Sequence, residues 1–428
     1  MRAKKTHPLT WVPSTYFAMG SVYKTVTDAT NIMFQNLGLS NATAAFWASA
    51  FGLPYTIKFL WAPLLEMYKT KKFFVVAMQV AIAVGLVLMG LALSLPDWLT
   101  ATIVLCYLLG VLGATQDIAA DGVYVTGLNA TEQARYTGFQ SMFWNVGPLF
   151  VTGILLSATG VFHNQLGMDW AGSWRTAFII LGGVLIASAL LHSRVMPPGA
   201  KADDAPRNVG EAAATFMDSF RSFFQKKGIW TMIAFSFLYR TSQGFLDKVG
   251  PLFLKDEVVD GGLEMSNEVL GFINGTVGLL GFLAGSVLGG LWIARKGLKP
   301  TLIWLCAAVN IPNATYIYLG LVQPQDTWVI GTIVTFEKFF FGFGAVGHML
   351  YMMQQLAPGR YQTAHYAFGT ALMGLCMMVT GMVSGWMQEQ MGYVNFFIFV
   401  MVATIPSFIV TYIAPFHVDT SQEEPAKT

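Results

Sequence analysis

Two acidic residues, Asp117 and Asp121, stand four positions apart in a long apolar segment that begins near residue 99. No loop signal interrupts the segment, so we expect one membrane helix that carries both carboxylates on the same face. An aspartate inside a membrane costs about 2.5–3.5 kcal/mol on insertion scales, so such residues usually face a watery cavity or a bundle interior. With the amide of Gln116 beside them, they predict a polar path through the membrane; a purely structural pair is the alternative.

Further charged residues lie within other apolar segments. At about 1.5 Å of rise per residue, Arg240 and Glu337 fall near the middle of their segments, too deep to reach the membrane surface. We expect these two to be functional, whereas Lys24 with Asp28 is equally well explained as a neutral pair that holds helices together. The formal charges of the whole set cancel: Lys24, Lys58, Arg240, Lys248 and Lys338 against Asp28, Asp117, Asp121, Asp247 and Glu337.

Proton coupling is one role expected of the acids. Burial favours the neutral form of a carboxyl group and a neighbouring cation favours the charged form, so an acid that changes partner can bind and release a proton. The candidates, in order of preference, are Glu337, Asp117, Asp28 and Asp121.

Substrate binding is the role expected of the cations. Arg240 and Lys24 can bind a carboxylate or a phosphate, and arginine is suited to a bidentate contact. Trp47, Tyr55, Trp144 and Phe341 can stack on a sugar ring, although membrane aromatics more often pack or line the interface. The other residues predicted to contact substrate are Lys338, Gln116, Tyr16, Asn145 and Gln243.

The composition sets the class of protein. Of 428 residues, 54% are hydrophobic and 11% are charged, against roughly 25% charged in soluble domains. Apolar segments of about 20 residues recur along the chain, each long enough to cross a membrane. The chain is therefore predicted to be an all-α polytopic membrane protein. The basic start is followed by a long apolar stretch without a cleavage site, so we expect it to remain as the first span.

Lysine and arginine cluster in alternate loops, while the loops between them are acidic. The positive-inside rule then places both termini in the cytoplasm and fits about twelve spans. Continuous helices are expected at about 9–36, 41–68 and 229–255, among others. Residues 196–228 form the one long connection, read as a cytoplasmic linker with a short amphipathic helix. It separates two six-helix halves, 1–195 and 229–415, and residues 416–428 are expected to be a disordered cytoplasmic tail.

Charges inside the spans concentrate on the first, fourth, seventh and tenth helices, which are equivalent positions in the two halves. That period is typical of transporters built from repeats around a central cavity. His348 and His365 lie on different helices and are interpreted as polar packing. No P-loop, nucleophile elbow or metal-ligand cluster is present, so no enzyme and no cofactor are expected.

Several motifs carry a family resemblance. The basic turn GLWIARKGLK at 290–299 resembles the loop motif of the major facilitator superfamily, and Glu66 with Lys69 stands at the matching place in the first half. Within that superfamily, KFLWAPLLE at 58–66 and ATQDIAADG at 114–122 are similar to the AmpG-type permeases, which include muropeptide permeases, acetyl-CoA transporters and siderophore importers. Glu66 stands where aspartate is expected. The residues assigned to a cytoplasmic gate are Lys58, Glu66, Lys69 and Arg295.

The resemblance implies a proton-coupled importer in a bacterial inner membrane that works by alternating access. The implied substrate is a cell-wall fragment, an anhydro-disaccharide with or without peptide. An importer of ferric siderophores or other small anionic solutes is the alternative, and a membrane sensor that does not transport is a third interpretation. The expected partners are a small anionic or sugar-containing substrate, protons and the lipid bilayer, with no nucleic acid and a monomeric chain.

Overall fold

The computed structural model describes residues 6–62, 65, 70–199 and 209–416, and all regular structure in these ranges is helical. In this part of the chain, eight helical segments are long and apolar enough to cross a membrane. The predicted all-α polytopic class is thus confirmed. The eight segments are Lys71–Ala92, Trp98–Gly127, Phe139–Asn164, Trp170–Val195, Asn267–Lys296, Leu298–Val322, Thr327–Leu356 and Ala364–Tyr412.

By its internal contacts the chain separates into two compact units. Unit 1 comprises Met1–Ala213 and Met265–Thr276, and unit 2 comprises Ala214–Glu264 and Val277–Thr428. The division into halves at residues 196–228 stays a prediction. Glu66, Lys69 and the tail after residue 416 lie outside the described residues.

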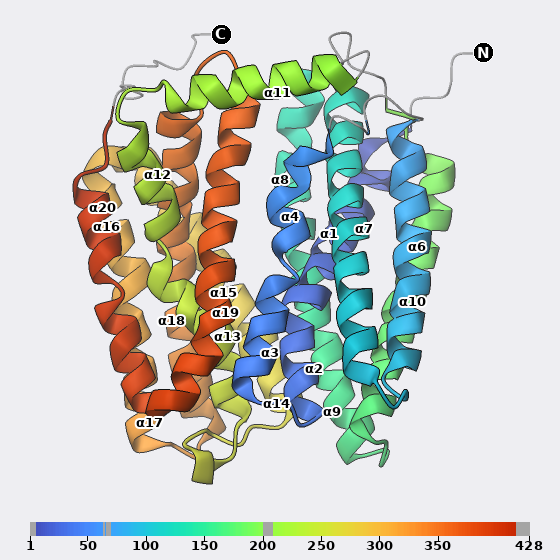
Figure 1. Ribbon diagram of the computed structural model, residues 1–428, viewed down its shortest axis with the longest axis vertical. Coiled ribbons are helices and arrows are strands. Elements are labelled where there is room, and N and C mark those ends of the chain that lie inside the picture. The colour runs from blue at the N-terminus through green and yellow to red at the C-terminus, as the bar shows by residue number, and fades with distance from the viewer. Residues whose placement is uncertain (1–5, 63–64, 66–69, 200–208, 417–428) are drawn as a thin grey trace. The chain divides into compact units, whose positions relative to one another are not determined.

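Unit 1 is built on long helices with side-chain caps. In α6 (Lys71–Ala92), the Thr70 side chain accepts from the Phe73 amide, and α8 (Ala130–Pro148) begins with a capping box between Asn129 and Glu132. Such caps satisfy amides that have no partner within the helix. Helix α6 packs between α7 (Trp98–Gly127) and α10 (Trp170–Val195), as Figure 1 shows.

Glycine allows α1 (Val12–Lys24) to approach α8 closely. A Cβ on Gly20 would lie 2.1 Å from the Trp144 carbonyl oxygen, and one on Gly147 would lie 2.5 Å from the Phe17 carbonyl oxygen. Gly20 therefore belongs to a helix contact, although it stands in register with Tyr16 and Lys24.

The first expected helix, 9–36, does not have uniform geometry. Helix α1 passes into a π-helical turn, η2 (Thr25–Ala29), and then into α2 (Thr30–Asn36). A π turn is wider than an α turn, so side chains before and after it are rotated relative to a regular four-residue stripe. The four-residue spacing of Tyr16, Gly20, Lys24 and Asp28 therefore does not keep them in one regular stripe.

The second expected helix, 41–68, is broken. From Asn41 to Leu60 it consists of α3 (Asn41–Ala50), α4 (Leu53–Ile57) and a short 3-10 turn, η3 (Lys58–Leu60). Gly52 and Pro54 explain the first break, because proline has no amide to donate and glycine is a weak helix former. The prediction of one continuous helix was wrong, and the second break lies at Lys58.

The seventh expected helix, 229–255, is also broken. Helix α12 (Ile229–Leu238) ends before Tyr239, and α13 (Thr241–Lys255) begins after Arg240, whose backbone is not helical (φ −117°, ψ 23°). The prediction of continuity was therefore wrong here as well. Interrupted membrane helices are tolerated where the freed backbone groups face protein or a cavity rather than lipid.

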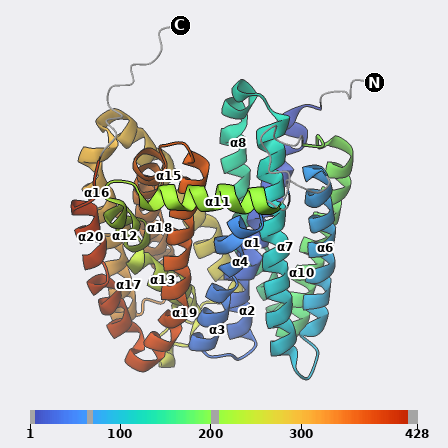
Figure 2. The same ribbon diagram turned by 45° about the horizontal axis from the view of Figure 1, so that its top comes forward.

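Several helices of unit 2 pack on α18 (Thr327–Tyr351). Helix α15 (Gly278–Lys296) lies beside α18 (Figure 2), and α16 (Leu298–Asn310) also contacts it. A Cβ on Gly285 would lie 1.9 Å from the Phe339 carbonyl oxygen, so glycine makes this contact possible. Helix α19 (Gln362–Val402) packs on α13 and bends at Gly392, where φ is +74°, and α20 (Ile405–Tyr412) follows.

The remaining helical elements of the described residues complete the fold. They are η1 (Pro8–Thr10), η4 (Leu149–Leu155), α9 (Leu156–Asn164), α11 (Val209–Phe224), η5 (Val258–Asp260), α14 (Asn267–Leu270), η6 (Gly271–Val277), η7 (Ile311–Ala314), α17 (Thr315–Val322) and η8 (Met352–Leu356).

The segment 265–276 is joined to unit 1 by polar contacts at one end. Asn267 Nδ2 donates to Asn36 Oδ1 and to Thr159 Oγ1, each at 2.9 Å. The Glu268 carboxylate accepts from Asn164 Nδ2 at 2.9 Å. These contacts connect α14 to both α2 and α9.

Two glycines continue the contact along η6. A Cβ on Gly271 would lie 2.7 Å from the Gly153 carbonyl oxygen, and one on Gly275 would lie 2.0 Å from the Thr152 carbonyl oxygen. Because backbone meets backbone, no side chain can move away to make room for a methyl group. This segment is therefore specifically fitted to η4 and α9.

We expect Gly275→Ala to lower the thermal unfolding temperature of the purified protein, because overpacking typically costs about 1–3 kcal/mol. The matched control is Gly290→Ala, since nothing lies within 4 Å of a Cβ built there. Both changes gain the same helix propensity, about 1 kcal/mol, so only the contact differs. Equal unfolding temperatures for the two variants would contradict the assigned packing.

Candidate functional site

The two acids of α7 are each held by a residue from a different element of unit 1. Asp117 forms an ion pair with Lys58, which stands at the second break of the interrupted second helix. The Tyr16 hydroxyl on α1 donates to Asp121 Oδ1 at 2.8 Å. Asp117 and Asp121 therefore lie on one face of α7, as expected, and Lys58 and Tyr16 contact that face.

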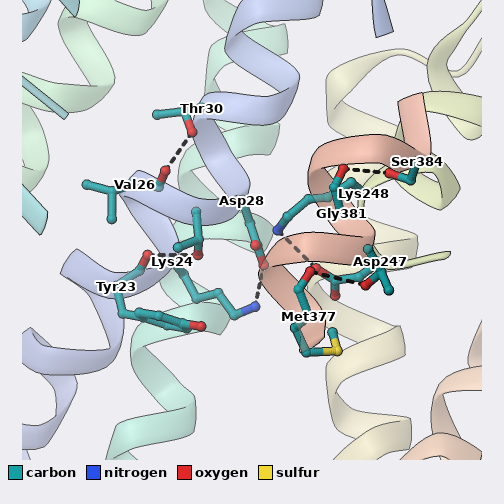
Figure 3. A network of polar contacts seen from close by, with 12 residues as sticks. Tyr23, Lys24, Val26, Asp28, Thr30, Asp247, Lys248, Met377, Gly381 and Ser384 are labelled. Atoms are coloured by element: carbon teal, nitrogen blue, oxygen red, sulfur yellow. Dashed lines mark hydrogen bonds and ion pairs between the residues drawn. The ribbon is translucent and has the colours of Figure 1, made fainter. Parts of the chain in front are cut away.

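Lys24 and Asp28 form the expected ion pair across the π turn η2 (Figure 3). The Lys24 ammonium lies 5.7 Å from the centroid of the Tyr23 ring. Both charged side chains keep 25% exposure, so the pair is partly accessible. π turns within α-helices frequently occur at functional sites.

Aromatic side chains lie next to this pair. The Tyr23 ring centroid is 4.9 Å from that of Tyr55 and 6.2 Å from that of Trp144. Gly113 provides the space for Tyr55, because a Cβ there would lie 2.0 Å from the tyrosine hydroxyl. Tyr23 was missed by sequence reasoning; its place beside Lys24 was the only available signal.

Several buried polar atoms in the described part of unit 1 have no hydrogen-bond partner. Among them are the Tyr55 hydroxyl and both polar atoms of the Gln116 side-chain amide. A buried polar group without a partner costs about 1–3 kcal/mol, so such groups call for a functional explanation. In contrast, Asn145 donates to the Ser141 carbonyl of its own helix at 2.8 Å, so its amide is already engaged.

In unit 2, Arg240 lies at the break between α12 and α13. Its guanidinium carbon is 4.7 Å from the centroid of the Phe341 ring, a cation–π contact, and Nη1 is 3.5 Å from Met373 Sδ. The break and the aromatic ring together fix the place of the cation. Arg240 and Phe341, both chosen from the sequence, are thus brought together.

Glu337 on α18 has a fully buried side chain. Its Oε2 lies 3.7 Å from the Lys338 ammonium. Gln243, which is itself buried, and Asp247 lie near the same carboxyl group. Asp247 pairs with Lys248 at 2.9 Å (Figure 3). Glu337, Lys338 and Gln243 therefore form one cluster within unit 2.

The predicted histidines are packed side chains. His348 is fully buried, with its ring centroid 4.8 Å from Tyr239 and 5.5 Å from Phe235. His365 lies 3.0 Å from the Ser222 hydroxyl. Among the described residues, no three histidine, cysteine or acidic side chains gather closely enough to hold a metal ion.

The gate assignment stays a prediction. Arg295 lies exposed in the last turn of α15, and Lys58 is engaged with Asp117. Glu66 and Lys69, the other two residues of that set, fall outside the described ranges.

A second polar network in unit 1 was also missed. His192 on α10 is fully buried, with Nδ1 at 2.9 Å from Gln79 Oε1 and Nε2 at 2.8 Å from the Ser14 hydroxyl. It joins α10, α6 and α1. A lone histidine at the end of an apolar segment was the only signal for it.

Comparison with known proteins places the chain among transporters. The model of the Major Facilitator Superfamily matches residues 14–385. Anhydromuropeptide permease of Escherichia coli K12 is 24% identical over 369 residues, covering 84% of this chain and 70% of the permease. Putative transporter AmpG 4 of Rickettsia conorii is 22% identical, covering 84% of this chain and 86% of its own length. The predicted resemblance to AmpG-type permeases is confirmed.

Solved structures agree with the fold. The nucleoside transporter NupG superposes with a TM-score of 0.70 at 13% identity, covering 95% of this chain and 97% of its own. A D-xylose-proton symporter gives 0.65 at 14% identity, covering 94% and 96%. At these identities the likeness concerns the fold alone.

We expect Lys58→Met to lower the unfolding temperature, because it leaves the mostly buried Asp117 carboxylate without its cation; such a loss costs about 1–3 kcal/mol or more. Asp117→Asn should also lower the unfolding temperature, because it leaves the Lys58 ammonium without the Asp117 carboxylate. The double variant should be more stable than the sum of the two single losses predicts, and a double-mutant cycle in thermal unfolding measures the coupling. Additive losses would mean that the pair contributes nothing to stability.

Proposed function

Because the chain belongs to the Major Facilitator Superfamily, we propose that this multi-pass membrane transporter imports a cell-wall-derived muropeptide or anhydro-disaccharide in symport with protons. The proposed substrate rests on the similarity to anhydromuropeptide permease over 84% of this chain. The proposed location is a bacterial inner membrane, with both termini in the cytoplasm.

The cations of the spans suit an anionic sugar derivative. Arg240 is held at a helix break by the Phe341 ring, and its planar guanidinium can grip a carboxylate with two hydrogen bonds. In unit 1, Lys24 lies beside Tyr23, and Trp144 is close to the same ring. Aromatic faces next to a cation are well suited to the apolar face and the charged substituent of a sugar acid.

The proton is assigned to Glu337. Its carboxyl group is fully buried, and the Lys338 ammonium at 3.7 Å is its ion-pair partner in unit 2. A buried carboxylate is stable only while a cation compensates its charge. If substrate binding draws that cation away, uptake of a proton by Glu337 restores neutrality. Asp117, Asp28 and Asp121 are further candidates for the proton path.

Alternating access requires contacts that form in one state and break in another. The segment 265–276 is our candidate for an extracellular contact of this kind, since it is joined to α2 and α9 through Asn267 and Glu268. Hydrogen bonds to side-chain amides and hydroxyls can exchange for water without leaving a charge buried. Release of this segment from α2 and α9 is the step that we assign to opening toward the outside.

Uptake into proteoliposomes tests the function directly. Labelled anhydro-disaccharide with and without peptide should accumulate when a pH gradient, acidic outside, is imposed. Accumulation should stop when the gradient is dissipated. Uptake of a ferric siderophore in place of the sugar would favour the alternative substrate class, and uptake that does not respond to the gradient would refute proton coupling.

We expect Glu337→Gln to abolish accumulation against a gradient, because a permanently neutral side chain cannot release a proton, while binding and exchange of substrate survive. Arg240→Ala should instead weaken binding at least tenfold, because the anionic group of the substrate loses its partner. The control is Glu257→Gln, which neutralises an exposed acid in a loop. If Glu337→Gln still concentrates substrate, the proton path lies elsewhere and Asp117 is the next residue to test.

The proposed orientation predicts the labelling of engineered cysteines in intact cells. Val259→Cys, on a loop where the native side chain is 85% exposed, should react with an impermeant maleimide. Thr215→Cys on α11 should react only after permeabilisation. The native cysteines Cys106, Cys306 and Cys376 are all buried, so background labelling should be low. The reverse pattern would overturn the assignment from loop charge.

A further inference from the structure

An exposed apolar strip runs along α11 and onto the start of α12 in unit 2. Met217, Phe220 and Phe224 are 44%, 41% and 37% exposed, and their spacing puts them on one side of the helix. Trp230 on α12 is 70% exposed, and its ring centroid lies 5.6 Å from that of Phe224. We call these four side chains the surface strip.

The opposite side of α11 packs against other residues of unit 2. Phe223 is buried, and its ring centroid lies 5.3 Å from that of Phe368 on α19. Lys226 Nζ donates to the Pro358 carbonyl oxygen at 2.7 Å, and Ser222 contacts His365. Helix α11 runs across the end of α19 (Figures 1 and 2). It cannot roll to bury the strip without breaking these contacts.

Basic residues border the surface strip. Arg221 is exposed and lies four residues from Met217, on the edge of the same side, and Lys227 is exposed in the turn that follows. Burial lowers the pKa of Lys226 to about 8, and its ammonium is already engaged with carbonyl oxygens. Arg221 and Lys227 are therefore the cations available to an external partner.

The strip is continuous with a membrane-facing surface. Gly228 (φ +72°) makes the turn, and α12, with the sequence IWTMIAFSFL, enters the apolar region directly after it. A tryptophan at the first turn of such a helix is typical of the membrane interface. We therefore expect Trp230 at the depth of the lipid headgroups, and the ring of Phe224 lies next to it.

We propose that the surface strip, with Arg221 and Lys227, is a binding surface for anionic phospholipid. An amphipathic helix with aromatic residues on one side and basic residues at its border lies in the plane of the interface, with its apolar side among the upper acyl chains. Arginine and lysine then attract anionic headgroups, roughly fivefold in binding per residue. This assignment needs only a membrane protein and is independent of the transported substrate.

Quenching in lipid nanodiscs tests the assignment on the full chain. An environment-sensitive fluorophore at Met217→Cys should be quenched by phosphatidylcholine brominated near the top of its acyl chains. The same fluorophore at Asp218→Cys, an exposed position about 100° around the helix from Met217, should be quenched by iodide from water instead. Strong iodide quenching at position 217 would show that the strip faces water, or a protein partner lost in purification, and would overturn the proposal.

The charge requirement has its own measurement. Raising the fraction of phosphatidylglycerol should increase lipid quenching at position 217, and the increase should disappear when Arg221→Gln and Lys227→Gln are combined. Lys296→Gln, which removes an exposed lysine at the end of α15, is the matched control and should keep the increase. Lipid quenching that does not respond to phosphatidylglycerol would overturn the anionic preference.

Discussion

The cost of holding a charge in hydrocarbon is the constraint on which the rest of this structure depends. A lone charged side chain there is disfavoured, and pairing or a polar cavity is the usual solution. In the described spans, four lysines each pair with an acid of the same unit. These four pairs are Lys24–Asp28, Lys58–Asp117, Lys248–Asp247 and Lys338–Glu337.

These pairs differ in what they join. Lys58 and Asp117 are 59 residues apart and connect the broken second helix to α7, so their contact fixes tertiary structure. Lys338 and Glu337 are sequence neighbours, and adjacent side chains on a helix point about 100° apart. Their contact at 3.7 Å joins no two helices. The first pair is therefore suited to holding a unit together, and the second to exchanging partners.

Local spacing was enough to predict that Asp117 and Asp121 share a face, because a helix fixes the direction of residues four apart. It was not enough to show that Tyr16 holds Asp121, since that contact spans 105 residues and depends on how α1 meets α7. Gly52 and Pro54 in the sequence do indicate the first break of the second helix. The apolar character of the segment instead favoured one continuous span. The break at Arg240 has no glycine or proline beside it and had no local signal.

The π turn at Thr25–Ala29 and the packing of segment 265–276 were beyond sequence reasoning for a similar reason. A π turn depends on one extra residue in the hydrogen-bond ladder, which hydrophobic periodicity does not register. Gly271 and Gly275, four residues apart, do suggest a close helix contact, but glycine spacing does not name the partner. Only the folded chain shows that η4 provides it.

In the proposed cycle, substrate and proton are coupled through the ion pair between Glu337 and Lys338. A substrate anion that attracts Lys338 competes with the carboxylate of Glu337 for one ammonium group. The carboxylate then remains as a buried charge with weaker compensation, and a proton restores its neutrality. Substrate and proton would thus favour each other's binding without touching. By linkage this effect is reciprocal, so protonation of Glu337 must raise the affinity for the anion by the same factor.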